Sequence, residues 1–149
     1  MIKKILNNKE LKKTVENLKE QNKKIITTNG VFDILHIGHI RYLQEAKKLG
    51  DVLIVAVNSD SSVKRIKGPK RPINSQDARA EVLSAMEFVD YVVIFNETTP
   101  IKILSEIKPN IHVKGGDYKI SQIVEKEVVE KNNGKIILMP EIKGYSTTN

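Results

Sequence analysis

The sequence predicts an α/β fold: a doubly wound parallel sheet of five strands with helices on both faces, preceded by an N-terminal helix. Short segments of strand character alternate with segments of helix length along the chain, as in parallel sheets. The strand segments are largely apolar throughout, as residues 52–57 illustrate, and such strands are buried on both faces. The length of 149 residues suits one domain, in which residues 1–23 add an N-terminal helix to the body formed by residues 24–149.

Helical periodicity is clear near the N-terminus. Leu11, Val15 and Leu18 recur at i, i+4 and i+7, so residues 8–21 predict an amphipathic helix. Residues 24–28 are rich in β-branched side chains and predict the first strand.

The remaining elements follow the same two patterns. Apolar runs predict four more strands, over residues 52–57, 91–95, 111–113 and 135–139. Apolar side chains in helical register predict helices over residues 38–49, 76–88, 100–108 and 121–132. In the second of these helices, Val82, Leu83 and Met86 are expected to face inward. Residues 61–75 are expected to form a long loop, and the alternation as a whole is Rossmann-like.

Composition excludes several classes of protein. With 40% hydrophobic and 29% charged residues, the chain resembles neither a disordered nor a membrane protein. No apolar run approaches the roughly 20 residues of a membrane-spanning helix, and no apolar block follows the basic N-terminus as in a secretory signal. The absence of cysteine excludes disulfide scaffolds and thiol nucleophiles, and we expect a cytoplasmic protein.

The net charge of +7 is concentrated in two patches. Residues 1–24 and 61–80 each carry a net charge of +5, so the other 105 residues sum to −3. The first patch is interpreted as a solvated helix face. The second follows a strand, and ligands of parallel α/β sheets bind beyond the carboxyl ends of the strands. A nucleic-acid-binding module is the alternative from a different class, but the aromatic content of 5% leaves little stacking surface.

Two histidines mark the turn after the first strand. His36 and His39 are three residues apart at an expected helix start, so both rings share one face. Free N–H groups at a helix N-terminus favour phosphate, and Gly38 leaves room for a ligand against the backbone. Structural residues or zinc ligands are other interpretations of the pair, but the glutamate of a zinc protease motif is lacking. His112, in a predicted strand, is expected to be structural.

Asn29-Gly-Val-Phe-Asp33 followed by His36-Ile-Gly-His39 resembles the signature of the HxGH nucleotidyltransferases, the cytidylyltransferase-like superfamily. The resemblance covers residues 24–149 and includes Val57-Asn58-Ser59-Asp60, Lys114-Gly-Gly-Asp-Tyr118 and Gly144-Tyr-Ser-Thr-Thr148. Within the superfamily, the chain is most similar to adenylyltransferases that make ADP-heptose from D-glycero-D-manno-heptose 1-phosphate, for lipopolysaccharide or related glycans. In many bacteria that activity is the second half of a protein fused to a sugar kinase.

The resemblance implies roles for individual residues. Contacts with the reacting phosphates are implied for His36, His39 and Lys67. Nucleotide binding is implied for Asn29, Gly30, Phe32, Gly38, Arg79, Lys114, Gly115, Ser146 and Thr147. Contacts with the sugar phosphate are implied for Asp33, Asn58, Asp60, Arg71, Asp117 and Tyr118. The resemblance further implies ATP as co-substrate, Mg²⁺ delivered with its phosphates rather than by protein ligands, small-molecule partners without nucleic acid or membrane, and a homodimer.

The chain departs from the pattern of cytidylyltransferase relatives at several positions. Gly116 stands where they carry an acidic residue, whose absence favours ATP over CTP, and Glu141 stands where they carry an arginine. The family pattern continues beyond Asn149 into a short helix, so either the sequence is truncated or that helix is missing. A glycerol-3-phosphate cytidylyltransferase, a GDP-heptose-forming enzyme and a catalytically dead nucleotide sensor remain alternatives, although intact His36 and His39 argue against the last.

Overall fold

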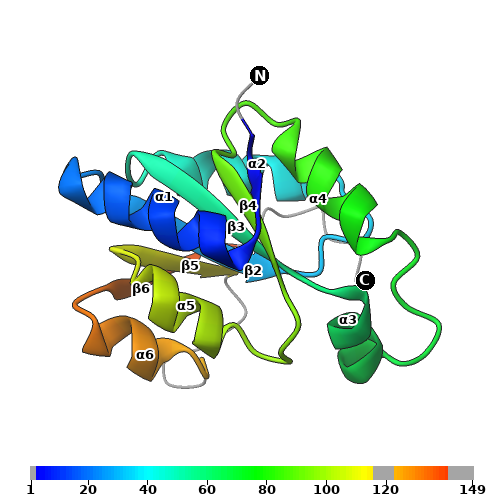
Figure 1. The fold of residues 1–149 in the computed structure, drawn as a ribbon. Coiled ribbons are helices and arrows are strands. Elements are labelled where there is room, and N and C mark those ends of the chain that lie inside the picture. The colour runs from blue at the N-terminus through cyan, green and yellow to red at the C-terminus, as the bar shows by residue number, and fades with distance from the viewer. Residues whose placement is uncertain (1–2, 116–122, 141–149) are drawn as a thin grey trace.

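The computed structural model describes residues 3–115 and 123–140, which are organised around one sheet (Figure 1). The strands are β1 (Ile5–Leu6), β2 (Ile25–Gly30), β3 (Val52–Asn58), β4 (Tyr91–Phe95), β5 (Ile111–Gly115) and β6 (Lys135–Met139). The helices are α1 (Asn8–Glu20), α2 (Ile37–Lys47), α3 (Asp60–Lys67), α4 (Gln76–Ser84), α5 (Ile101–Ile107) and α6 (Lys126–Lys131). The strand order is β1-β4-β3-β2-β5-β6, and every pair is parallel. The predicted doubly wound, Rossmann-like sheet is therefore confirmed.

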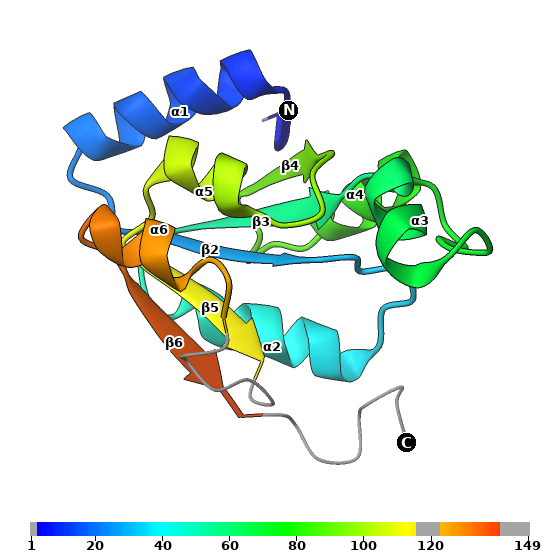
Figure 2. The ribbon, with the colours of Figure 1, turned by 90° about the horizontal axis from the view of Figure 1, so that it is seen from below.

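Helices cover both faces of the sheet (Figure 2). On one face, Leu11 of α1 and Leu104 of α5 belong to the same core cluster as Ile54 of β3. On the other face, Leu43 of α2 and Leu83 of α4 share a cluster with the alternate residues of the strands. Burial of these apolar side chains is the main stabilising contribution to the fold. Helix α1 thus supplies part of the first core, where Leu11 and Val15 pack with the residues of the sheet.

The sheet has six strands where the sequence predicted five. The additional strand, β1, lies at the edge and pairs with β4 through Ile5 and Leu6, which align with Val92 and Val93. A strand of two residues is too short to show a periodic pattern. It nevertheless fixes the start of α1, whose first turn is capped by the side chain of Asn7.

The expected loop over residues 61–75 was wrong in its first part, which belongs to α3. The side chain of Ser59 caps α3 by accepting a hydrogen bond from the amide of Ser62 at 3.2 Å. Val63 is buried whereas Ile66 is 47% exposed, so this helix has too few inward apolar residues to show helical periodicity. The prediction for Val82 was also wrong, because α4 buries Arg79, Ala80 and Leu83 and leaves Val82 50% exposed.

Several helices are shorter than predicted. Helix α4 ends at Ser84 rather than at residue 88, and α5 begins at Ile101 with Pro100 as its N-cap. Within the described ranges, every helix is too short or too polar to span a bilayer.

The turn between α6 and β6 is held closely against the turn that precedes β5. A Cβ atom added to Gly134 would lie 2.4 Å from the carbonyl oxygen of Pro109 and 3.0 Å from Cγ1 of Val129. Asn133, immediately before it, adopts a positive φ of 67°. The turn therefore tolerates no side chain at Gly134 without displacing β6 from β5.

We predict that Gly134→Ala lowers the free energy of unfolding by about 1–3 kcal/mol, because the added methyl group overlaps backbone atoms. Urea unfolding followed by circular dichroism measures this change. Asn133→Gly is the matched control and should be at least as stable as the wild type, since glycine adopts positive φ without strain. Equal midpoints for Gly134→Ala and the wild type would show that the turn can move freely.

Candidate active site

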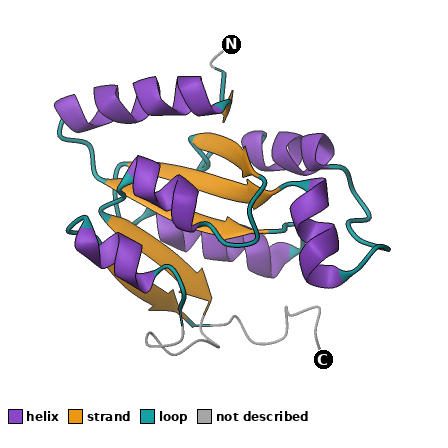
Figure 3. Ribbon diagram, turned by 60° about the horizontal axis from the view of Figure 1, so that its bottom comes forward, coloured by secondary structure: helices purple, strands orange, loops and turns teal. Residues whose placement is uncertain are grey.

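The carboxyl ends of three adjacent strands form one edge of the sheet. β3, β2 and β5 are neighbours and end at Asn58, Gly30 and Gly115. Helix α2, which follows β2, covers one face of the sheet, whereas α6, which follows β5, covers the opposite face (Figure 3). The connections that leave β2 and β5 therefore diverge to opposite faces between these two neighbouring strands. In open α/β sheets the crevice at such a divergence is the ligand site.

The turn between β2 and α2 is closed by a reciprocal cap between two histidines. Nδ1 of His36, the N-cap residue, accepts a hydrogen bond from the amide of Gly38 at 3.0 Å. The amide of His36 in turn donates to Nδ1 of His39 at 3.2 Å. A ring nitrogen that accepts a hydrogen bond carries no proton, so these two hydrogen bonds place the ring proton of each histidine on Nε2. Both histidines therefore offer an Nε2–H donor at the helix N-terminus.

The two imidazoles lie next to each other at this turn. Their ring centroids are 4.1 Å apart, with an angle of 49° between the planes. Burial, and secondarily the proximity of His36, lower the pKa of His39 below its usual value, which keeps this ring neutral at pH 7. The predicted shared face of His36 and His39 is thus present, and the local hydrogen bonds determine which nitrogen atoms remain for a ligand.

Phe32 and Gly30 shape the approach to the histidines. The ring of Phe32 packs edge-on against His39 at a centroid distance of 6.1 Å, and Phe32 itself is 9% exposed. A Cβ atom at Gly30 would lie 2.9 Å from the Phe32 ring, so glycine makes room for it. Phe32 has a positive φ of 51°, which turns the chain sharply after β2. The described position of Phe32 is therefore in the core beneath the histidines, and its contact with nucleotide stays a prediction.

Asp33 connects the histidine turn to the loop after α3. Its carboxylate accepts hydrogen bonds from the amides of Ile73 and Asn74 at 2.7 and 2.8 Å, and Arg71 lies 3.8 Å away. Burial raises the pKa of this carboxyl, but the two amides and the charges of Arg79 and Arg71 outweigh that effect and lower it. The carboxylate thus holds the basic loop beside the site, and its predicted contact with the sugar phosphate is untested.

Arg79 lies at the centre of the three connections. Its buried guanidinium donates to the carbonyl oxygens of Val31, Asn58 and Asn74 at 2.7, 2.8 and 3.0 Å. It also pairs with Asp60 at 2.9 Å. With its side chain 0% exposed, Arg79 joins the segment after β2, the end of β3 and the residues just before α4. Binding of phosphate by Arg79 stays a prediction, and so does the role of Asp60.

The lysine expected to reach the phosphates is exposed. Lys67 occupies the last turn of α3, and Gly68 ends this helix with a positive φ of 96°. The short helix thereby presents a cluster of basic side chains beyond the edge of the sheet, which includes Lys64 and Arg65. Asn58, in contrast, is 4% exposed and donates to the hydroxyl of Ser62, which anchors the start of α3.

Lys114 projects from β5 towards β2. Its Nζ lies 3.4 Å from Oδ1 of Asn29 and 2.9 Å from Oε1 of Glu125. Gly115 follows, and a Cβ atom there would meet no other atom within 4 Å. Glu125 was not predicted from the sequence. Its buried partner Lys114 is 11 positions earlier in the chain, and a single acidic residue near a helix start has no spacing pattern that indicates such a contact.

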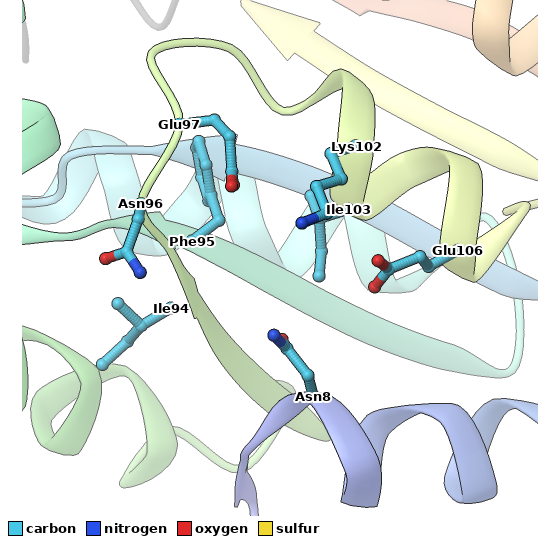
Figure 4. A pocket seen from close by; sticks show the side chains of 8 residues that line it. All are labelled: Asn8, Ile94, Phe95, Asn96, Glu97, Lys102, Ile103 and Glu106. Atoms are coloured by element: carbon cyan, nitrogen blue, oxygen red, sulfur yellow. The ribbon is translucent and has the colours of Figure 1, made fainter.

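Four predicted site residues, Asp117, Tyr118, Ser146 and Thr147, lie outside the described residues. Among residues 3–115 and 123–140, no group of three or more histidine, aspartate or glutamate side chains could hold a metal ion. A hollow at the end of β4, separate from the histidines, is lined by polar residues that include Asn96, Lys102 and Glu106 (Figure 4).

Sequence comparison identifies close relatives of the chain. Residues 27–149 match the family described as cytidylyltransferase-like. The chain is 52% identical over 145 residues to the bifunctional protein HldE of Actinobacillus pleuropneumoniae serotype 5b, and the match covers 97% of this chain and 30% of that protein. It is 50% identical over 135 residues to the bifunctional protein HldE of Geobacter metallireducens, covering 91% and 28%, respectively. The chain thus spans less than a third of the length of these relatives.

Solved structures support the same grouping. A lipopolysaccharide core biosynthesis protein from Thermoplasma volcanium superposes with a TM-score of 0.67 at 35% identity, covering 81% of this chain and 98% of that one. A pantoate-beta-alanine ligase from Francisella tularensis, at 21% identity and a TM-score of 0.68, shares the fold. With the family match over residues 27–149, these relatives confirm that the chain belongs to the cytidylyltransferase-like family of nucleotidyltransferases.

Proposed function

We propose that the protein transfers the adenylyl group of ATP to D-glycero-D-manno-heptose 1-phosphate, forming ADP-heptose and pyrophosphate. The observation that carries this proposal is the pair of Nε2–H donors that His36 and His39 offer at the N-terminus of α2. Similarity to the HldE proteins supports the choice of sugar substrate.

The proposed reaction is an in-line displacement at the α-phosphorus of ATP. An oxygen of the sugar phosphate attacks, the bond between the α-phosphorus and the bridging oxygen breaks, and pyrophosphate leaves with the electron pair. The nucleophile is already an anion, so no general base is needed. The protein contributes by positioning the substrates and stabilising charge. His36 and His39 would donate hydrogen bonds to the phosphate oxygens, where the partial positive charge of the α2 N-terminus acts in the same direction.

The carboxylates of the described site do not form a metal centre. The carboxylate of Asp33 accepts hydrogen bonds from two backbone amides, and that of Asp60 forms an ion pair with Arg79. We therefore propose that Mg²⁺, which neutralises triphosphate charge when bound, is held by the ATP phosphates and water. The exposed basic side chains of α3, including Lys67, would contact the triphosphate. A cytoplasmic location and a homodimer complete the proposal, the former because ATP and sugar phosphates occur there.

The choice of substrates can be tested directly. Pyrophosphate release should be fastest with MgATP and D-glycero-D-manno-heptose 1-phosphate, and mass spectrometry should detect ADP-heptose. The comparison uses CTP or GTP as donor and glycerol 3-phosphate as acceptor. Activity with CTP and glycerol 3-phosphate but not with ATP and the heptose phosphate would overturn the substrates and preserve nucleotidyl transfer. Absence of pyrophosphate from every pair would contradict the enzymatic function itself.

Substitutions of His39 separate the roles of its two ring nitrogen atoms. His39→Ala and His39→Asn should both lower kcat by at least about tenfold, or about 1.4 kcal/mol, because both remove the Nε2–H donor. Asparagine places an oxygen near the position of Nδ1 and can still accept from the amide of His36. His39→Asn should therefore retain a higher melting temperature than His39→Ala. A loss of kcat below tenfold in both variants would contradict a role in the transition state.

A further inference from the structure

Three ionisable side chains meet beneath the edge of the sheet. Oε1 of Glu125 lies 2.9 Å from Nζ of Lys114 and 3.4 Å from Nε2 of His112. The Glu125 side chain is 2% exposed, that of His112 is 0% exposed and that of Lys114 is 15% exposed. Glu125 immediately precedes α6. His112 and Lys114 are two positions apart on β5, so their side chains point to the same face of the sheet.

A carboxylate this deeply buried requires a charged partner. Burial raises the pKa of Glu125, but His112 and Lys114 together outweigh this effect and lower the pKa to about 2. Glu125 is therefore ionised at neutral pH. Among the residues that the structure describes, these two neighbours are the groups that can balance its negative charge.

His112 is not that counterion. Its Nδ1 lies 2.8 Å from the hydroxyl of Thr27, and burial lowers its pKa more strongly than the nearby Glu125 raises it. The ring is thus neutral at pH 7, with Nδ1 accepting from Thr27 and the proton on Nε2, which lies 3.4 Å from the carboxylate. The ammonium of Lys114 is left as the charge that balances Glu125.

The location of Lys114 relates this ion pair to the active site. Its Nζ also lies 3.4 Å from Oδ1 of Asn29 on the adjacent strand β2, beside the crevice between β2 and β5. Asn29 is seven residues before His36, the N-cap of α2. A lysine side chain has four rotatable carbon–carbon bonds and is mobile unless its ammonium is held. Glu125 approaches from beneath, so the ammonium is held at the edge of the sheet rather than extended into solvent.

We propose that Glu125 is a positioning residue that holds Lys114 against Asn29, where its ammonium contacts the phosphates of the bound nucleoside triphosphate. The inference rests on the proposed function, because it requires a nucleotide in the crevice between β2 and β5. Glu125 itself touches no substrate. Its effect on binding is exerted through Lys114, and that dependence distinguishes positioning from a purely structural contact between α6 and β5.

The test measures the dissociation constant for MgATP by isothermal titration calorimetry. Glu125→Leu removes the acceptor and should weaken binding by about tenfold, the effect expected when a charge-assisted contact is lost. Glu125→Gln keeps an oxygen that accepts from the Lys114 ammonium, so its dissociation constant should lie between those of Glu125→Leu and the wild type. If Gln binds MgATP more tightly than the wild type, Glu125 attenuates positive charge instead of positioning it, and the proposal fails.

A double-mutant cycle examines the dependence on Lys114. Lys114→Met should weaken MgATP binding, and adding Glu125→Leu to it should cause no further loss. If the two substitutions weaken MgATP binding independently, so that their effects multiply in the double variant, Glu125 does not act through Lys114. If Glu125→Leu lowers the melting temperature but binds MgATP like the wild type, Glu125 is only a structural contact. Glu130→Leu is the matched control on α6, because it removes an exposed ion pair with Lys126 and should leave binding unchanged.

The outcomes also separate this inference from the proposed function. If the wild type does not bind MgATP, the proposed function fails and the inference fails with it. If the wild type binds MgATP and forms ADP-heptose while Glu125→Leu binds equally well, the positioning role of Glu125 fails alone. Thermal unfolding of each variant shows whether the protein is folded. If Glu125→Leu is unstable, Glu125→Gln still decides the question, because glutamine preserves the volume of the side chain.

Discussion

The reciprocal cap between His36 and His39 is the constraint on which the candidate site depends. A cap satisfies amide groups that would otherwise lack partners at the start of α2. Here the capping atoms are Nδ1 of both imidazoles, so the same two hydrogen bonds that begin the helix also orient the rings and select their tautomer. Helix formation and preparation of the donor atoms are therefore one event, and a change at either histidine affects both.

The next layer of the site consists of contacts between segments distant in the sequence. Arg79 binds the carbonyl oxygens of Val31, just after β2, and of Asn58, the last residue of β3, whereas Asp33 binds amides of the loop after α3. Arg79 and Asp33 therefore bond to groups of the protein itself, and the exposed lysines of α3 lie beyond the edge of the sheet. Hydrogen-bond donors held in place by the cap, with basic side chains beyond them, form an arrangement suited to an anionic phosphate ligand.

Local patterns explain what could be predicted from the sequence. The apolar runs that become β2 to β6 and the three-residue spacing of His36 and His39 depend on neighbours in the chain, and both were recognised. The two-residue strand β1 and helix α3, with Val63 as its main apolar anchor, are too weakly patterned to recognise. The partners of Arg79 and Glu125 depend on how strands and helices align in space. No spacing rule specifies such contacts, so the sequence identified Arg79 without its environment and did not identify Glu125 at all.

The distribution of charge also changes how the net charge of +7 is understood. Within the basic stretch 61–80, Arg79 is buried and paired with Asp60, so it contributes little to the surface potential. The exposed part of the patch is the set of side chains on α3 and in the loop that follows, which Asp33 holds beside the histidine turn. Beneath the same edge, the Lys114 ammonium is balanced by Glu125. Positive charge is thus strongest at the rim and largely neutralised inside, an arrangement that attracts an anionic ligand from solution and leaves its final position to directed hydrogen bonds.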